Sequence, residues 1–262
     1  MKHSERPVVV FDSGLGGISV LKKLAAVMPN ETFVYYGDSA NAPYGPRDPR
    51  EVCRLTVEGV ARLEALHPKA IVIACNTATA AAQEALEKRY PQIPVIGIEP
   101  AVRRALQENP GGRILSLATA GTLASPRYQR QLGEVAELGK VVSVAAPGIV
   151  SYVEDGMRDH AGMMAYLGEL FAPWQSVVFD GVVLGCTHFP FAAAEIRQAL
   201  GYPVRLYEQS RAVAEETQRR LIELGTASKD GCAGKVTIMN SADEKTMLSF
   251  SWQLFSAVPG CI

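Results

Sequence analysis

Short apolar runs alternate with longer amphipathic stretches along most of this 262-residue chain. Apolar runs of four or five residues bounded by turn residues are typical of buried strands, whereas apolar residues three and four positions apart are typical of helices. The apolar runs predict strands at 7–11, 32–36, 70–74, 95–98, 113–117, 140–144, 181–184, 204–207 and 236–239. The amphipathic stretches predict helices at 18–28, 49–66, 80–89, 126–138, 161–171, 191–200, 211–225 and 245–255. This alternation indicates an α/β fold with parallel sheets.

The first and second parts of the chain contain similar segments. "AIVIACNTATAAAQEAL" (70–86) and "GVVLGCTHFPFAAAEIRQAL" (181–200) each combine a strand, a Cys, a Thr-containing turn and an Ala-rich helix. "FDSGLGG" corresponds to "LATAGTL", and "VIGIEPAV" to "VRLYEQSRAV", at a similar separation and in the same order. Three matches in register predict two pseudo-symmetric α/β domains. We expect the first domain to contain residues 1–97 plus 208–262, and the second domain to contain residues 98–207.

Several polar residues and thiols fall where predicted strands end. In parallel sheets ligands bind beyond the carboxyl ends of the strands, and clefts between domains are favoured ligand sites. Asp12, Cys75, Thr119 and Cys186 all follow predicted strands. A thiol at a helix start has a lowered pKa, because unpaired N–H groups give it positive surroundings. We therefore expect the two thiols to approach one ligand from opposite sides of a cleft, with His188 close enough to share a proton with Cys186.

Composition and charge narrow the classes of protein. Hydrophobic residues make up 48% and charged residues 20% of the chain, the net charge is −1 and the pI is about 6.4. These values suit a folded globular protein and give no overall positive charge for nucleic acid. No apolar run approaches the roughly 20 residues of a membrane span, and the polar start "MKHSERPVVV" resembles no targeting segment, so we expect a cytoplasmic protein. The sequence does not determine the oligomeric state, and a homodimer stays open.

The other cysteines suggest no further chemistry. Cys53, Cys232 and Cys261 lack the strand–Cys–helix context, and none of the five cysteines has CxxC spacing. This pattern is typical of free thiols rather than of a disulfide framework or a zinc site. We expect these three cysteines to be structural.

Paired thiols facing one cleft are compatible with several reactions. A Cys–His pair alone would suit nucleophilic acyl transfer, whereas a metal site needs about four ligands and a redox pair needs disulfide distance. Proton transfer at a stereocentre needs an acid/base on each face of a carbon atom. Two symmetric halves are useful only for this last reaction.

Six motifs together carry a family resemblance. "FDSGLGG", "YYGDSANAPYG", "ACNTATA", "GIEPAV", "LATAGTLAS" and "VLGCTHFP" occur in this order within residues 8–190. In this order they resemble the glutamate racemases. The resemblance implies two α/β domains with the active site between them and interconversion of L- and D-glutamate. It also implies a reaction without metal or other cofactor, and a supply of D-glutamate for peptidoglycan.

The resemblance also implies roles for individual residues. Cys75 and Cys186 correspond to the two catalytic acid/bases, and Asp12 and His188 correspond to their respective helpers. Glu154, in "VSYVEDG", is a looser match to an acidic residue near the second thiol. The residues implied to contact glutamate are Asp12, Ser13, Pro43, Tyr44, Gly45, Asn76, Thr77, Thr119, Thr122, Thr187 and His188.

Other interpretations stay open from the sequence alone. A dinucleotide-binding protein would explain Gly14 and Gly16 after a strand and Asp38 at the end of the next one, but Ser19 replaces the third glycine of that motif. Asp38 also suits a loop anchor. A racemase acting on aspartate or another acidic amino acid would use similar paired thiols. A protein that binds an amino acid without catalysis would use the same cleft.

Overall fold

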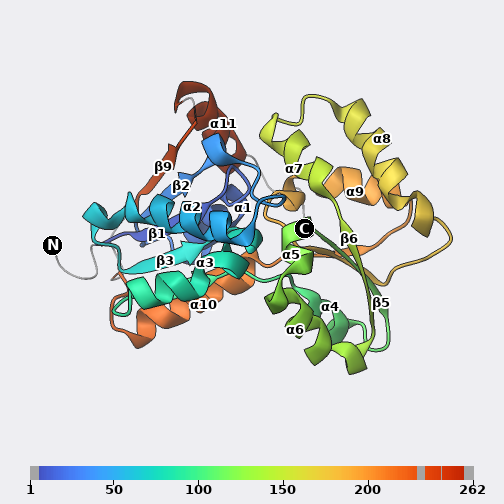
Figure 1. The fold of residues 1–262 in the computed structure, drawn as a ribbon, viewed down its shortest axis with the longest axis horizontal. Coiled ribbons are helices and arrows are strands. Elements are labelled where there is room, and N and C mark those ends of the chain that lie inside the picture. Colours follow the sequence, from blue (N-terminus) through green and yellow to red (C-terminus); the bar gives the residue numbers. More distant parts are fainter. Residues whose placement is uncertain (1–5, 229–233, 243, 257–262) are drawn as a thin grey trace.

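Two parallel sheets form the centre of the molecule. The computed structural model describes residues 6–228, 234–242 and 244–256, so Cys232 and Cys261 lie outside the described residues. The first sheet contains, in spatial order, β4 (Val95–Gly97), β3 (Ala70–Ile73), β1 (Val8–Asp12), β2 (Phe33–Gly37) and β9 (Val236–Asn240). The second contains β6 (Lys140–Ala145), β5 (Arg113–Ala118), β7 (Gly181–Leu184) and β8 (Arg205–Tyr207). Neighbouring strands are parallel throughout, and the sheets lie on opposite sides of Figure 1.

Helices cover both faces of each sheet. The helices around the first sheet are α1 (Ile18–Val27), α2 (Pro49–Ala61), α3 (Asn76–Arg89), α10 (Ser210–Glu223) and α11 (Glu244–Ser256). Those around the second are α4 (Val102–Glu108), α5 (Ala120–Ala124), α6 (Pro126–Glu134), α7 (Pro147–Glu154), α8 (His160–Phe171) and α9 (Ala193–Leu200). Alternate residues of β1 pack into hydrophobic cores on opposite faces of the sheet. Val8 and Val10 pack with residues of α1, whereas Val9 and Phe11 pack with residues of α2. Burial on both faces explains why the strands read as continuous apolar runs.

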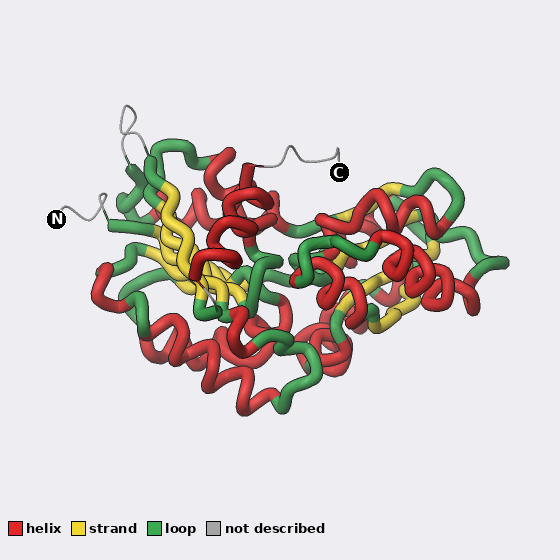
Figure 2. The backbone as a smooth tube through the Cα atoms, turned by 90° about the horizontal axis from the view of Figure 1, so that it is seen from above, coloured by secondary structure: helices red, strands yellow, loops and turns green. Residues whose placement is uncertain are grey.

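The strand orders of the two sheets are the same. The order β4-β3-β1-β2 of the first sheet corresponds to β8-β7-β5-β6 of the second, which confirms the two similar α/β domains predicted from the internal repeat. Figure 2 shows the two strand groups side by side, each enclosed by helices. After the second domain, the chain returns to the first sheet: β9 pairs with β2, and α10 and α11 pack against α1. The carboxyl ends of both sets of strands are thus available to one cleft.

Some helix boundaries differ from those that the hydrophobic periodicity predicts. Helix α3 begins at Asn76 rather than at residue 80, because the sulfur of Cys75 caps its first turn. The expected helix from residue 191 begins instead as a 3₁₀ turn, Phe189–Ala192, before α9. The short helices α4, α5 and α7 lie where no helix was predicted. Segments this short carry too few turns to give a clear helical period.

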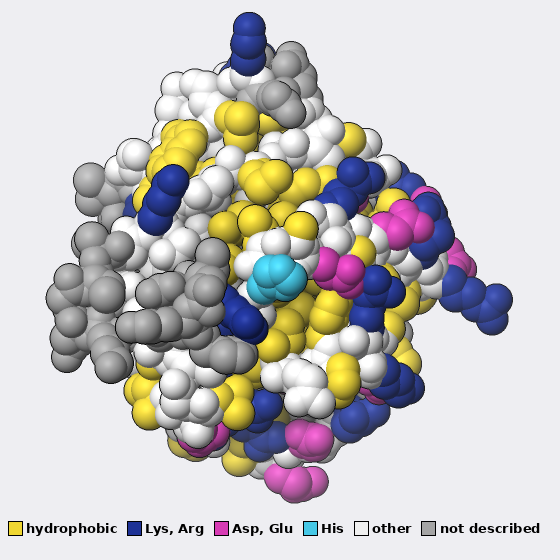
Figure 3. All heavy atoms as spheres, turned by 90° about the vertical axis from the view of Figure 1, so that its left-hand side faces the viewer, with side chains coloured by type: hydrophobic (Ala, Val, Ile, Leu, Met, Phe, Trp, Pro, Cys, Tyr) yellow, Lys and Arg dark blue, Asp and Glu magenta, His cyan; other side chains and the backbone are white. Residues whose placement is uncertain are grey.

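The surface carries charges of both signs. Figure 3 views the end of the molecule formed by the first domain, where acidic and basic side chains lie near exposed hydrophobic ones. Within the described residues, no helix combines the length and apolar character required to cross a membrane.

Candidate active site

A cavity of about 210 Å³ lies between the two sheets, where their strands end. Cys75 follows β3 and Cys186 follows β7, the corresponding strands of the two domains, and both thiols line this cavity. Its volume is below the range of about 300–1,000 Å³ typical of pockets for drug-sized ligands, so it suits a small molecule. The lining residues are Ser13, Ala42, Pro43, Tyr44, Gly45, Pro46, Cys75, Asn76, Thr77, Thr119, Ala120, Pro147, Val150, Ser151, Glu154, Cys186 and His188.

Three of the residues implied to contact substrate do not line the cavity. Asp12 is fully buried, and its carboxylate accepts hydrogen bonds from the Gly14 N–H at 2.9 Å and the Thr187 hydroxyl at 3.3 Å. Thr122 accepts a hydrogen bond from Thr119 at 3.0 Å. Thr122 thus bonds a residue that lines the cavity, whereas Asp12 and Thr187 bond each other, and direct contact of all three with a ligand stays a prediction.

The Cys75 thiol is held in its neutral form. Its sulfur lies 3.3 Å from the Ser13 hydroxyl and accepts a hydrogen bond from the Ala78 N–H at 3.4 Å. Burial and the neighbouring Asp12 carboxylate nevertheless raise the pKa of Cys75 to about 12. The lowered pKa expected from its place at the start of α3 is therefore wrong, because the loss of hydration outweighs the positive helix end.

Cys186 has a different set of neighbours. A 3₁₀ turn, Phe189–Ala192, separates it from α9, so its sulfur does not cap the first turn of an α-helix as that of Cys75 does. Its sulfur lies 3.6 Å from Nδ1 of His188, and Nε2 of the same ring lies 2.6 Å from Oε1 of Glu154. Burial lowers the pKa of His188, but its hydrogen bonds with Cys186 and Glu154 raise that pKa well above its ordinary value. The imidazole thus faces the Cys186 sulfur on one side and the Glu154 carboxylate on the other.

Asn76 supplies a pair of unused hydrogen-bonding groups. Its side chain lines the cavity and is 5% exposed, yet neither its amide nitrogen nor its amide oxygen has a partner in the protein. A buried amide without partners costs about 1–3 kcal/mol, so a ligand that pairs with it gains affinity. Lys and Arg are missing from the residues that line the cavity. Amides, hydroxyls and N–H groups are therefore available to bind an anionic ligand.

The loop after β2 closes one side of the cavity. Asp38 anchors this loop, because its carboxylate accepts hydrogen bonds from the Tyr44 hydroxyl at 2.7 Å and from the Asn41 amide at 3.0 Å. The Gly45 carbonyl then accepts a hydrogen bond from Gly121 N–H of the second domain at 3.2 Å. The buried ring of Tyr44 thus lines the cavity while its hydroxyl is occupied by the protein.

Sequence reasoning missed part of the lining. Pro147, Val150 and Ser151 lie in α7 and border the cavity together with Glu154. Helix α7 follows β6, so the rule that ligands bind beyond the ends of parallel strands also applies to this segment. Among the described residues, no group of three or more His, Cys, Asp or Glu residues is placed to hold a metal ion.

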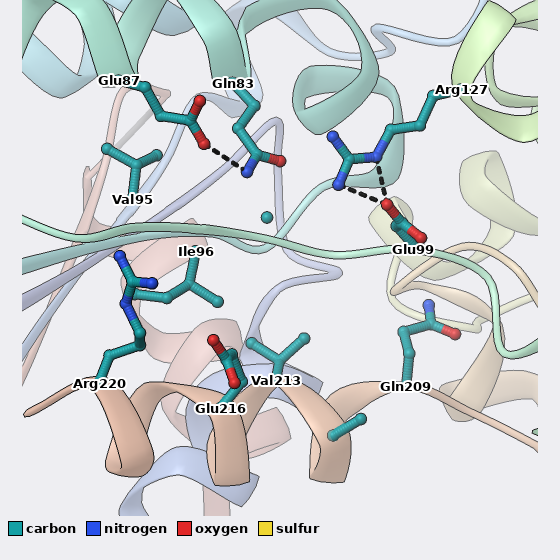
Figure 4. A pocket seen from close by; sticks show the side chains of 12 residues that line it. Gln83, Glu87, Val95, Ile96, Glu99, Arg127, Gln209, Val213, Glu216 and Arg220 are labelled. Atoms are coloured by element: carbon teal, nitrogen blue, oxygen red, sulfur yellow. Dashed lines mark hydrogen bonds and ion pairs between the residues drawn. The ribbon is translucent and has the colours of Figure 1, made fainter. Parts of the chain in front are cut away.

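A larger cavity, of about 410 Å³, lies away from both thiols. It follows the edge strand β4 between α3 and α10 and extends to Arg127 of α6 (Figure 4). Gln83 donates a hydrogen bond to Glu87 at 2.8 Å, and Arg127 pairs with Glu99. Of the residues with candidate roles in proton transfer, Cys75, Cys186, His188 and Glu154 line the smaller cavity, and Asp12 is buried without lining it.

The fold and the smaller cavity define a class of two-domain protein with one thiol contributed by each domain to a shared site. Comparison with known proteins identifies the family. The family model for Asp/Glu/Hydantoin racemase matches residues 16–217. The chain belongs to this racemase family.

Relatives and solved structures agree with this assignment. A glutamate racemase of Clostridium novyi is 40% identical over 93% of this chain and 94% of its own length. One from Clostridium perfringens is 38% identical over 95% of both chains. The crystal structure of glutamate racemase from Francisella tularensis in complex with D-glutamate has a TM-score of 0.83 and 25% sequence identity, and the match covers 97% of this chain and 95% of that one.

Proposed function

We propose that this protein interconverts L- and D-glutamate without a cofactor, by a two-base mechanism that uses Cys75 and Cys186. The observation that carries the proposal is the pair of thiols, one after β3 and one after β7, that line the same small cavity. Burial and the Asp12 carboxylate raise the pKa of Cys75 to about 12, whereas the sulfur of Cys186 lies 3.6 Å from Nδ1 of His188. In the proposed reaction one thiol group acts as the acid while the other, as a thiolate, acts as the base.

In one direction, the Cys186 thiolate removes the α-proton of glutamate, and the Cys75 thiol gives its proton to the opposite face of the same carbon. Cys186 is then a thiol and Cys75 a thiolate, which is the state required for the reverse reaction. The Ser13 hydroxyl, 3.3 Å from the Cys75 sulfur, is placed to donate a hydrogen bond to that thiolate. The contact with Glu154 keeps a positive charge on the His188 imidazole beside Cys186. The negative charge of Asp12 raises the pKa of Cys75.

The substrate is held by polar groups from both domains. We place one carboxylate of glutamate at the unpartnered amide of Asn76, beside the N-terminus of α3, whose free N–H groups favour an anion. Thr77 and Thr119 come from different domains, and their hydroxyls lie 2.9 Å apart at the cavity. These contacts stabilise the negative charge that develops when the α-proton leaves. The two units that meet at the cavity are the proposed domains 1–97 plus 208–262 and 98–207.

The proposed role in the cell is to supply D-glutamate for peptidoglycan from the cytoplasm. A bacterial strain without its own glutamate racemase should grow without added D-glutamate when it expresses this chain, and the chain should be found in its cytoplasmic fraction. A homodimer is a further prediction, which light scattering after size-exclusion chromatography tests.

Racemisation is tested directly in deuterated water. L- or D-glutamate incubated with the protein alone should lose its circular dichroism signal and exchange its α-proton for deuterium. Cys75→Ser and Cys186→Ser should each abolish racemisation, and each should still exchange the proton of one enantiomer only, a different one for each variant. Cys53→Ser is the matched control, because Cys53 lies in α2 away from the cavity, and it should keep full activity.

Two other outcomes would indicate a different function. Loss of signal with aspartate but not with glutamate would indicate a racemase for the shorter acidic amino acid. Binding of glutamate that neither serine variant alters, without turnover in the parent protein, would indicate a binding protein.

A further inference from the structure

The glycine-containing loop between β1 and α1 packs against the second domain rather than around a bound phosphate. We call residues 14–17 the glycine loop. The carboxylate of Glu154, which comes from α7 of the second domain, accepts a hydrogen bond from the Leu15 N–H at 2.7 Å. The same oxygen lies 2.6 Å from Nε2 of His188. A glycine loop after a strand is a common anion site, and the anion here is a carboxylate of the protein itself.

Two glycines of this loop leave room for the side chains of Glu154 and His188. A Cβ atom on Gly14 would lie 2.1 Å from Oε1 of Glu154, and one on Gly16 would lie 2.4 Å from Nδ1 of His188. Both distances are far below van der Waals contact. Any side chain at these positions would therefore displace Glu154 or His188.

Further contacts fix the loop on the first domain and dock it on the second. The buried Tyr35 hydroxyl of β2 donates a hydrogen bond of 2.6 Å to the Gly14 carbonyl. The Ser19 hydroxyl lies 2.8 Å from the Gly16 carbonyl and 3.0 Å from the Thr187 carbonyl of the second domain. Ser19 occupies the position of the third glycine in a dinucleotide-binding motif, and here it links the two domains.

We propose that the glycine loop of the first domain is a positioning element for the second base: it holds Glu154 against His188, and His188 in turn faces Cys186. The inference rests on the proposed racemase function and extends it, because each domain then contributes to both bases. Cys186, His188 and Glu154 come from the second domain, but the N–H that fixes the carboxylate comes from the first.

The test is Gly14→Ala. The Ala methyl group would meet the end of a flexible glutamate side chain rather than backbone, so the fold is expected to persist while Glu154 moves. The matched control is Gly168→Ala, in α8, where an added Cβ meets nothing within 4 Å. The kcat/KM of Gly14→Ala should fall about ten- to hundredfold, the usual effect of losing a hydrogen bond between charged groups, and that of the control should not change.

Two measurements distinguish a change in the position of Glu154 from a general loss of structure in Gly14→Ala. The titratable groups that face His188 are Cys186, Glu154 and Asp12. When Glu154 moves away, the pKa of His188 measured by NMR titration should fall, and alkylation of Cys186 followed by mass spectrometry should need higher pH. Alkylation of Cys53 serves as the internal reference, because this residue lies outside the cavity.

A double variant tests whether the glycine loop acts on His188 through Glu154. If the glycine loop acts through this side chain, Gly14→Ala should cost almost nothing further in a Glu154→Ala background. Independent, additive losses would overturn the proposal, as would an unchanged His188 titration in Gly14→Ala. The NMR and alkylation measurements need no turnover, so they test the loop even if the chain fails to racemise glutamate, and that failure would count against the proposed function alone.

Discussion

Replacing Glu154 by Gln removes one negative charge and keeps nearly the same shape. The Gln oxygen can still accept the hydrogen bond from the Leu15 N–H, so the loop contact is retained. What is lost is the carboxylate 2.6 Å from Nε2 of His188, in a pair whose side chains are only 4% and 18% exposed. We expect the imidazole to hold its proton less tightly, and the Cys186 thiolate to lose its positive neighbour.

The size of the effect follows from the kind of bond that is lost. A hydrogen bond to a charged group contributes about 1.5–3 kcal/mol, which corresponds to about a ten- to hundredfold change in rate. L- and D-glutamate have equal free energies, so the values of kcat/KM in the two directions must fall by the same factor. The pKa of His188 is raised in the folded protein, so its proton is lost only on the alkaline side, and the alkaline limb of kcat/KM should move to lower pH in the variant.

The same linkage applies to stability. A raised pKa in the folded state stabilises the protein below the ordinary histidine pKa of about 6.5, and this contribution disappears as the pH rises through the folded value. Glu154→Gln should therefore lose more thermal stability at pH 6 than at alkaline pH.

Initial rates in both directions, followed by circular dichroism from pH 6 to pH 10, provide the assay. Glu195→Gln is the matched control, because Glu195 lies 3.6 Å from His160 in a histidine–carboxylate contact outside the cavity. It should change neither rate nor pH profile. A Glu154→Gln enzyme with a rate within twofold of the parent and an unmoved alkaline limb would refute this account of the second base.

Three further substitutions test other parts of the structure. Asn76→Ala should raise the KM for glutamate about ten- to hundredfold with little change in melting temperature, because its amide bonds nothing in the free protein. Asp12→Asn should raise the melting temperature at pH 7 in calorimetry, because burial raises the pKa of this carboxyl and its ionised form costs stability, and the gain should vanish at a pH below about 3.9. Lys69→Met leaves the buried Glu31, 2.5 Å away, without its cation and should lower the free energy of unfolding in urea by about 3–5 kcal/mol.

Each of these predictions would be contradicted by a specific result. An unchanged KM in Asn76→Ala would mean that the substrate does not reach this amide. A gain from Asp12→Asn that is the same at all pH values would exclude ionisation as its cause. For Lys69→Met the control is Arg54→Ala, in an ion pair more than half exposed, which should cost below about 1 kcal/mol. Equal losses in these two variants would contradict the role of burial.

The sequence predicted the architecture because its signals are local and repeated. Continuous apolar runs such as that of β1 are buried on both faces of a parallel sheet, so their pattern indicates strands directly. The repeat around Cys75 and Cys186 then predicted two similar sheets and placed one thiol at the end of corresponding strands. The short helices α5 and α7 were not predicted, because fewer than three turns give little hydrophobic periodicity.

The chemistry of each thiol depended on contacts that no local pattern records. Both cysteines have the same sequence context, yet burial and the Asp12 carboxylate raise the pKa of Cys75, whereas Cys186 lies 3.6 Å from a histidine that is paired with Glu154. Glu154 reaches the glycine loop across 139 positions of sequence, which spacing alone does not reveal. The sequence by itself thus determined the strands, the repeat and the place of the thiols, because these follow from the side-chain order along the chain. Only the tertiary structure decided which groups surround each thiol, because desolvation and charge depend on neighbours brought together by folding.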